Sequence, residues 1–236
     1  MKKPVVNYRT FSLDKLNGEF SYLKLLLFWP VHGLVFSFLE KGLFQQFYYP
    51  MHCVLDDIIP FCEWFFIPYL IWFLFIPAML IYGFLREPEG FVKTMQFIIV
   101  SYAFTLFVYF VFPTCQNLRP EHFEMDNILT RMIARFYAND TNTNVFPSLH
   151  VLGSIAVSYG ARFCEKLRRR KGWIAAIDIT AILITVSTCF VKQHSALDVF
   201  AAVLVAFMTV ALIREFDLQT APGVVRRRAA LQQTVR

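Results

Sequence analysis

Charged residues are scarce in this sequence. Asp, Glu, Lys and Arg make up 17% of its 236 residues, whereas a soluble domain carries about a quarter. Hydrophobic residues reach 57%, and the mean hydropathy is +0.49. This composition excludes a disordered chain and an ordinary soluble enzyme. It predicts one membrane-embedded domain over residues 1–236.

Cysteine motifs and repeats are also lacking. The five cysteines show no C-x-x-C spacing, which argues against a zinc ribbon or a redox motif of that type. The sequence has no internal repeats and no low-complexity stretch. Information about the fold therefore lies mainly in the long apolar runs.

Six apolar segments can cross a bilayer, each as a helix of about 20 residues. The second and third are the clearest, because no charged residue interrupts residues 64–85 or 94–118. The fourth and sixth are rich in small residues, which favour helix–helix contact in lipid, so we expect these two in the interior. The sequence predicts an all-α polytopic membrane protein, a bundle of six transmembrane helices at Tyr22–Leu39, Trp64–Leu85, Phe91–Pro113, Pro147–Cys164, Trp173–Val191 and His194–Ile213.

The 23 Lys and Arg residues outnumber the 17 Asp and Glu residues, which gives a net charge of +6, and they gather mainly between the apolar segments. Short cationic clusters beside membrane helices are typical of cytoplasmic loops rather than of a nucleic-acid groove. Six crossings would place the clusters at residues 2–15, 166–171 and 214–228 on one side. We therefore expect the lipid bilayer as a partner, no nucleic acid, a plasma or cytoplasmic membrane location, and both termini in the cytoplasm.

The same topology brings a few polar residues together at the outer face. They come from the ends of the third, fourth and sixth segments and from the long outer segment, residues 114–146, where we expect an interfacial helix at Met125–Tyr137. Ionisable groups near membrane helices are costly and are therefore functional candidates. The candidates are Arg119, Ser148, His150, His194 and Asp198.

His194 and Asp198 are four residues apart, so on a helix they share one face. A carboxylate there can accept the Nδ1 proton of the imidazole and leave Nε2 free, as in sites that use a histidine base. Such a pair by itself more often only locks a helix. Its coincidence with the other outer residues favours a functional role.

The stretch from Pro147 to His150 opens the fourth segment. Proline suits a first helical turn, and the free backbone N–H groups there attract anions. Ser148 adds a hydroxyl group and His150 adds an acid. The alternative is a simple helix cap with an interfacial histidine.

Other outer residues give weaker signals. Glu121 and His122 can act as zinc ligands, but no third histidine is well placed, so we expect neither a metal nor another cofactor. Asp56, Asp57 and Glu63 are expected in a solvated loop. Cys53 and Cys115 can pair on the outer side, and the spacing leaves this open.

Three stretches resemble the motifs of the type 2 phosphatidic acid phosphatase superfamily, which read Lys-x6-Arg-Pro, Pro-Ser-Gly-His and Ser-Arg-x5-His-x3-Asp. Their order and spacing match, and they occupy residues 112–198, from the third segment to the sixth. The corresponding residues are Phe112 to Arg119-Pro120, Pro147-Ser148-Leu149-His150, and Ser187-Thr188 through His194 to Asp198.

The resemblance implies a lipid phosphatase that works through a phosphohistidine. His194 would attack phosphorus, Asp198 would orient it, and His150 would protonate the leaving oxygen and then activate water. Arg119, Ser148 and backbone N–H groups near Leu149 would bind the phosphoryl oxygens. The substrate would be a membrane phospholipid or isoprenoid phosphate at the outer face.

The sequence departs from these motifs at Phe112, Leu149 and Thr188, which replace Lys, Gly and Arg. Two cationic phosphate ligands are therefore missing. Either Lys192 substitutes, or the substrate carries less charge at phosphorus, as in the similar sphingomyelin-synthase and inositol-phosphorylceramide-synthase branch. The alternatives are thus a lipid phosphotransferase or phosphodiesterase, and a non-catalytic lipid-binding protein. A transporter is less consistent with the uncharged middle helices.

Overall fold

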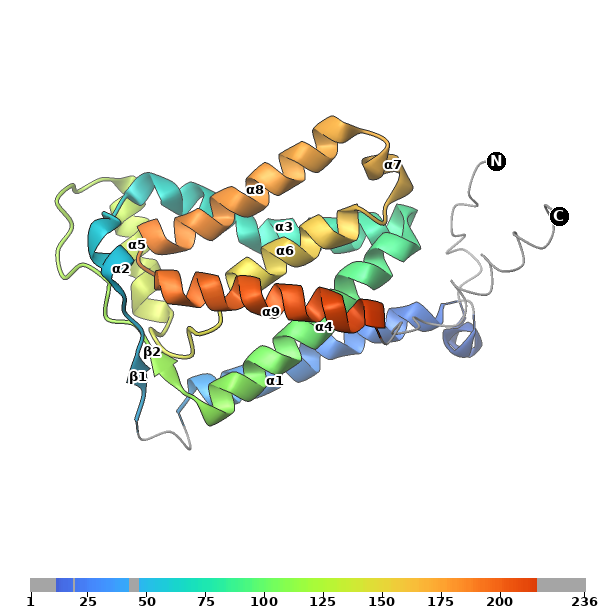
Figure 1. The fold of residues 1–236 in the computed structure, drawn as a ribbon, viewed down its shortest axis with the longest axis horizontal. Coiled ribbons are helices and arrows are strands. Elements are labelled where there is room, and N and C mark those ends of the chain that lie inside the picture. The colour runs from blue at the N-terminus through green and yellow to red at the C-terminus, as the bar shows by residue number, and fades with distance from the viewer. Residues whose placement is uncertain (1–11, 19, 43–46, 216–236) are drawn as a thin grey trace.

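The computed structural model describes residues 12–18, 20–42 and 47–215. Within these ranges the chain is mainly helical, and its long helices pack side by side in a bundle (Figure 1). Two short 3-10 segments, η2 (Leu13–Asn17) and η3 (Ser21–Leu27), precede the first bundle helix. The bundle consists of α1 (Phe28–Glu40), α3 (Phe66–Arg86), α4 (Pro88–Val111), α6 (Leu149–Ala161), α8 (Lys171–Phe190) and α9 (Ala196–Glu215).

Among the described residues, five helical stretches are long and apolar enough to cross a membrane. The first continues η3 into α1, and the second continues η4 (Glu63–Phe65) into α3. They are Ser21–Glu40, Glu63–Arg86, Pro88–Val111, Lys171–Phe190 and Ala196–Glu215. These stretches agree with five of the six predicted segments and identify an integral membrane protein.

The fourth predicted segment, Pro147–Cys164, forms the shorter helix α6. Its 13 residues rise about 20 Å, less than the roughly 30 Å of a hydrocarbon core. Most of its side chains are buried, and α6 contacts α3, α4, α8 and α9. Its predicted interior position is confirmed: protein rather than lipid surrounds most of it.

The same expectation is wrong for the sixth segment. Its helix α9 exposes Phe200, Leu204 and Phe207. Helix α4, which forms from the third predicted segment, is more buried than α9. Ala202 and Ala206 of α9 are buried in the bundle, whereas Ala211 is exposed. Large side chains occupy the exposed side, so average composition did not reveal its position.

Helices α4 and α6 approach closely where glycine removes a side chain. A Cβ atom added to Gly160 would collide with Oγ1 of Thr94 and lie 3.1 Å from the carbonyl oxygen of Gly90. Thr94 Oγ1 in turn donates a hydrogen bond to that carbonyl at 2.8 Å. This contact fixes the position of α6, whose first turn carries His150.

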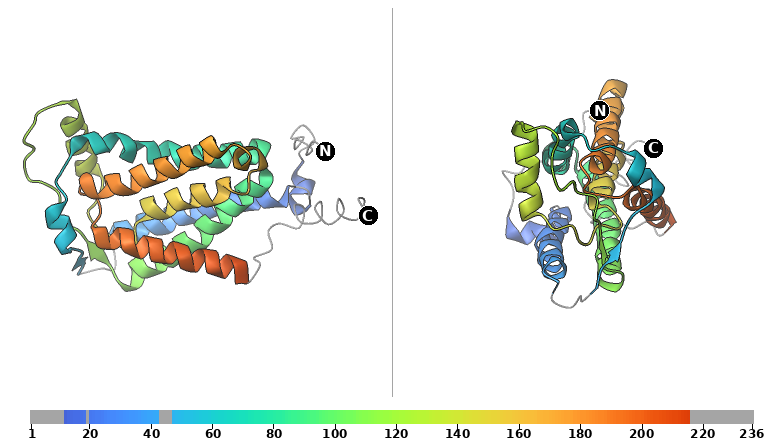
Figure 2. Two further views of the ribbon diagram at one scale, coloured as in Figure 1. Left: turned by 45° about the horizontal axis from the view of Figure 1, so that its top comes forward. Right: turned by 90° about the vertical axis from the view of Figure 1, so that its left-hand side faces the viewer.

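One end of the bundle is covered by short elements (Figure 2). Strand β1 (Tyr49–Pro50) pairs in parallel with β2 (Thr114–Cys115) and ties the segment before α2 (Val54–Ile58) to the loop after α4. Helix α5 (Ile128–Asn139) lies where a helix was predicted at Met125–Tyr137. Its Phe136 ring contacts Phe66 and Tyr69 of α3.

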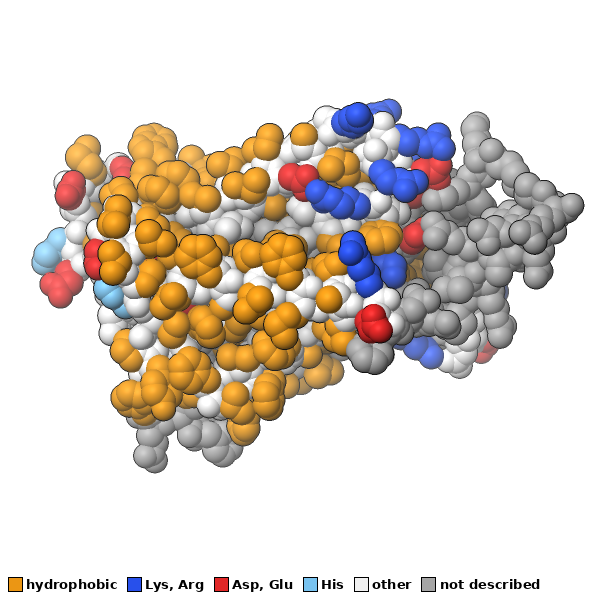
Figure 3. All heavy atoms as spheres, in the orientation of Figure 1, with side chains coloured by type: hydrophobic (Ala, Val, Ile, Leu, Met, Phe, Trp, Pro, Cys, Tyr) orange, Lys and Arg blue, Asp and Glu red, His pale blue; other side chains and the backbone are white. Residues whose placement is uncertain are grey.

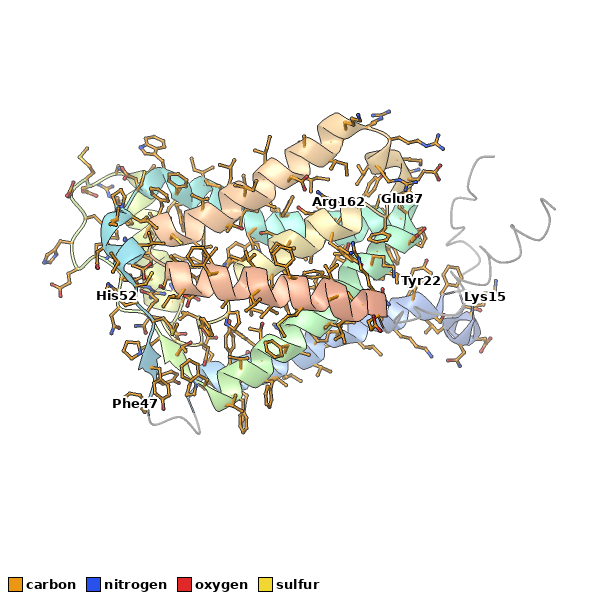
Figure 4. The ribbon with its side chains drawn as sticks, in the orientation of Figure 1. Lys15, Tyr22, Phe47, His52, Glu87 and Arg162 are labelled. Atoms are coloured by element: carbon orange, nitrogen blue, oxygen red, sulfur yellow. The ribbon has the colours of Figure 1, made fainter. Side chains whose placement is uncertain are left out.

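The other end carries α7 (Glu165–Arg168) and most of the described cations, while hydrophobic side chains cover the middle of the face in Figure 3. His52 lies at the end near α2, and Glu87 and Arg162 lie near α7 (Figure 4). The terminal clusters with Lys2, Lys3, Arg9 and Arg226–Arg228 fall outside the described residues.

Replacing Gly160 with Ala is expected to lower the free energy of unfolding by about 1–3 kcal/mol, as extra groups in packed cores do. The measurement is the thermal unfolding midpoint of the detergent-purified protein. Gly33→Ala is the control, because a Cβ there meets nothing within 4 Å. An equal midpoint in both variants would contradict the close approach of α4 and α6.

Candidate active site

His194 and Asp198 form a hydrogen-bonded pair at the start of α9. Oδ2 of Asp198 accepts hydrogen bonds from Nδ1 of His194 at 3.1 Å and from the backbone N–H of Ser195 at 2.9 Å. The second bond is half of a capping box, in which the third helical residue folds back onto the cap. The predicted helical pairing is corrected: His194 precedes α9, and capping brings it to Asp198. The carboxylate acceptor keeps the proton on Nδ1 and leaves the lone pair of Nε2 available.

His150 faces this pair from the first turn of α6. Its Nδ1 lies 3.3 Å from Nε2 of His194. The His150 ring packs against Tyr69 and Trp72 of α3, with centroid separations of 4.8 and 4.3 Å. Its Nε2 is buried and has no hydrogen-bond partner among the described residues. The two histidines and the carboxylate therefore form one chain of contacts across α6 and α9.

A small cavity of about 60 Å³ adjoins both histidines. This space exceeds the roughly 10–15 Å³ that a single water molecule requires. Its lining also includes Gln193, Asp140 and Glu40. The arrangement places an oriented imidazole and a second imidazole beside a space suited to a small polar group, and such a pair can act as nucleophile and acid.

Arg119 lies behind this cavity rather than in its wall. Its guanidinium donates to Oε1 of Gln193 at 2.8 Å and to the carbonyl of Asp140 at 2.9 Å, and it stacks 4.6 Å from the Tyr137 ring centroid. Burial lowers the pKa of Arg119, and the charge of Asp140 offsets part of this shift. Arginine stays charged at neutral pH. The structure thus brings Arg119 to the site with one side chain, Gln193, between it and His194.

Ser148 and Leu149 lie at the start of α6, as predicted. Ser148 is the N-cap of α6, and its hydroxyl oxygen accepts the Val151 N–H at 3.4 Å. The backbone N–H of Ser148 donates to the carbonyl of Asp198 at 3.2 Å. Leu149 lines the cavity. The starts of α6 and α9 are therefore joined directly.

A family model described as the PAP2 superfamily matches residues 39–212, from the end of α1 into the last turn of α9. The chain belongs to the PAP2 superfamily. This confirms the superfamily that the sequence resembles. Comparisons with the curated proteins and with the solved structures found no match.

The two PAP2 motif positions that lack a cation are occupied in other ways. Phe112 is 37% exposed and stacks on Tyr49 with ring centroids 4.7 Å apart. Thr188 is buried, and its hydroxyl donates to the carbonyl of Thr185 at 2.8 Å. Neither residue lines the cavity beside the histidines.

Lys192, the residue expected to substitute, is engaged elsewhere. Its Nζ donates to the carbonyls of Asp56 and Ile59 at 2.8 and 2.5 Å, at the end of α2. These bonds join the turn before α9 to α2. Lys192 is not part of the cavity wall, and it would have to leave these carbonyls to reach a phosphate there.

Asp56 is the residue that the sequence reasoning missed. It was expected in a solvated loop with Asp57, but it is 4% exposed. Its Oδ2 accepts from the Ser195 hydroxyl and its Oδ1 accepts from the Ala196 N–H at 2.8 Å. Burial acts to raise the pKa of Asp56, but the bonds from Ser195, Ala196 and Cys53 outweigh it, and the pKa is lowered. The spacing of Ser195 and Asp198 was a visible capping signal, whereas nothing local linked Asp56 to it.

The candidates with weaker sequence signals stay apart from this site. Glu121 and His122 are exposed, and among the described residues no group of three His, Cys, Asp or Glu side chains is arranged to hold a metal ion. Cys53 and Cys115 are free thiols. Glu63 accepts a hydrogen bond from Asn127 before α5 at 3.0 Å.

Replacing Asp56 with Ala is expected to destabilise the protein by about 3 kcal/mol, since each hydrogen bond to a charged group contributes about 1.5–3 kcal/mol. The matched control is Asp57→Ala, because the Asp57 side chain is 65% exposed and its described partner is His52. Thermal unfolding in detergent measures both. Equal unfolding midpoints for the two variants would contradict the inference that the Asp56 carboxylate holds the start of α9 in place.

The stability difference between wild type and Asp56→Ala should depend on pH in a direction that follows from the pKa of Asp56. Because the pKa of Asp56 is lowered on folding, its contribution is complete above the unfolded value of about 3.9. It is lost as the pH falls through the lower folded value. The stability difference between wild type and Asp56→Ala should therefore stay constant from about pH 5 to 8 and shrink only in stronger acid.

Proposed function

We propose that the protein is an integral membrane lipid phosphatase that removes phosphate from a phospholipid or isoprenoid phosphate through a phosphohistidine at His194. The observation that carries this proposal is the chain of contacts from Asp198 through His194 to His150, beside a cavity. Membership of the PAP2 superfamily supports phosphatase-type chemistry.

In the proposed first step, Nε2 of His194 attacks phosphorus while the bond from phosphorus to the lipid oxygen breaks. His150, which enters the step as an imidazolium, gives a proton to that oxygen and becomes neutral, and the lipid alcohol leaves. Asp198 stabilises the imidazolium character that develops on His194. Because the two histidine nitrogens are only 3.3 Å apart, the rings must separate as the phosphoryl group enters.

In the second step, His150 takes a proton from water, and the water oxygen attacks phosphorus. The bond from phosphorus to His194 breaks and phosphate is released. Arg119, Ser148 and the Leu149 backbone N–H are the proposed ligands of the phosphoryl oxygens. Phosphoryl transfer depends mainly on such positioning and charge stabilisation.

We further propose six membrane crossings, with α6 and its flanking residues as the fourth. The site would then lie at the outer face and both termini in the cytoplasm. Helix α7, which carries Lys166 and Arg168, lies at the end of the bundle opposite the starts of α6 and α9 (Figure 1), and Lys and Arg side chains gather at that end in Figure 3. This separation supports the proposed orientation, because cytoplasmic loops are enriched in Lys and Arg.

A second candidate function is phosphotransfer from a lipid phosphodiester to a lipid hydroxyl group. The observation that favours it is the shortage of cations: the cavity is lined by Glu40 and Asp140, and no Lys or Arg is part of its described wall. A diester carries less charge at phosphorus than a monoester. An acceptor alcohol, rather than water, would then resolve the phosphohistidine.

His194→Ala is expected to abolish turnover and the phosphohistidine, and His150→Ala to slow turnover by about 10²–10⁴-fold, the usual contribution of a general acid. The assay uses detergent-purified protein, a panel of labelled lipid phosphates, and detection of an alkali-stable phosphoprotein. His52→Ala is the control, because His52 is exposed at the same end (Figure 4).

Substantial turnover by His194→Ala would overturn the phosphohistidine mechanism. A wild-type protein that binds these lipids but gives neither turnover nor adduct across the panel would instead be a non-catalytic lipid-binding member of the family.

Hydrolysis and transfer are separated by the fate of the label. The wild-type protein is incubated with a head-group-labelled phosphodiester lipid or a labelled lipid phosphate, with and without ceramide or diacylglycerol. For a phosphatase we expect labelled inorganic phosphate that does not depend on the acceptor. A labelled lipid product that requires the acceptor would overturn hydrolysis in favour of transfer.

A further inference from the structure

A second, larger hollow lies at the end of the bundle opposite the histidines. It is a groove of about 580 Å³ between α3 and α8, with Val157 of α6 also in its lining and α7 at its end. This volume lies within the range of about 300–1,000 Å³ that small-molecule sites occupy. The groove shares no lining residue with the cavity beside His150 and His194.

The walls of the groove are apolar along their length. On α3, Phe75, Met79 and Tyr82 recur at helical spacing, so they share one face. On α8, Trp173 and Ile177 are four residues apart and face the same space. Such a lining fits a hydrocarbon chain.

The α7 end of the groove is cationic. Lys166, Arg169 and Arg170 line it, and no Asp or Glu is part of its lining. Arg169 pairs with Glu165, whereas the side chains of Lys166 and Arg170 form no ion pair within the described part of the chain. Helix α8 begins here at Lys171 without a side-chain cap, and its N-terminal dipole adds positive potential.

We propose that this groove binds one anionic phospholipid of the surrounding leaflet. An acyl chain would lie between α3 and α8, and the phosphate head group would contact Lys166 and Arg170. Charge complementarity argues for this occupant: basic pockets between membrane helices suit anionic head groups. Two other occupants are less compatible with the groove cations. The carboxy-terminal segment of the chain carries Arg226–Arg228, and a second copy of the protein would bring the same cations, so in both cases like charges would meet.

The test compares two charge-matched double variants of the full chain in nanodiscs. Lys166→Gln with Arg170→Gln removes the two groove cations, and Arg168→Gln with Lys171→Gln removes two neighbouring cations that do not line the groove. The probe is phosphatidylglycerol with brominated acyl chains, diluted in phosphatidylcholine. Bromine quenches nearby tryptophan, and Trp173 lies in the groove.

We expect brominated phosphatidylglycerol to quench wild type more than the same fraction of brominated phosphatidylcholine. The groove variant should bind about 30-fold more weakly, since each cation contributes about 1 kcal/mol near anionic lipid and 1.4 kcal/mol is tenfold. The neighbouring pair should bind like wild type. Equal quenching by the two lipids, or equal weakening in both double variants, would overturn the proposal.

A tryptophan comparison keeps the test independent of whether the charge variants fold. Trp173→Phe should remove the excess quenching by the anionic lipid. Trp64→Phe should retain it, because Trp64 is an exposed residue of η4, near the histidine end. Excess quenching that persists in Trp173→Phe would overturn binding in this groove.

Discussion

The histidine end of the bundle depends on the hydrogen bonds that hold the turn between α8 and α9. Four of the five residues from Val191 to Ser195 form hydrogen bonds with another part of the chain. Val191 bonds Tyr137 of α5, and Lys192 bonds two carbonyls at the end of α2. Gln193 bonds Arg119, and Ser195 bonds the Asp56 carboxylate. The remaining residue, His194, is left to bond Asp198 and face His150. The position of His194, the proposed nucleophile, is thus set by contacts with α2, α5 and the loop after α4. A turn buried beside membrane helices needs such partners, because burying a polar group without a hydrogen bond is unfavourable. Mutational measurements put the free-energy cost at about 1–3 kcal/mol for each such group.

Much of the helical framework could be predicted from the sequence, because uninterrupted apolar stretches have few other stable arrangements in lipid. His150, His194 and Asp198 could also be singled out, since ionisable residues are rare in such a chain. Their meeting is a consequence of where α6 and α9 begin, and both starts carry capping residues, Ser148 and Ser195. The length of α6 was harder to predict from the sequence. Its apolar character extends to Cys164, but close packing on α4 through Gly160 lets a short helix lie inside protein instead of spanning lipid by itself.

Residues whose role depends on distant partners could not be predicted. Asp56 and Ser195 are 139 positions apart, and no local pattern distinguishes Asp56 from the exposed Asp57 beside it. Lys192 looked available for a phosphate, but its contact with α2 spans 136 positions. The side of α9 that faces lipid was obscured for another reason: alanine is compatible with both environments, so only the placement of Phe200 and Leu204 distinguishes the two faces. Periodicity was therefore more informative there than the proportion of small residues.

The contact between the two histidines bears directly on the proposed reaction. With the Nδ1 proton of His194 held by Asp198, its Nε2 lone pair accepts a hydrogen bond from the Nδ1–H of His150. The proposed nucleophile is thus already paired with the group proposed to act as the acid. A net contribution of about 1 kcal/mol is typical of such a bond, so a lipid that fills the cavity can displace it at small cost. When phosphorus takes the lone pair of His194, His150 loses its acceptor at the same moment that the leaving oxygen needs a proton. In the proposed mechanism, the same pair therefore couples substrate entry to protonation of the leaving group.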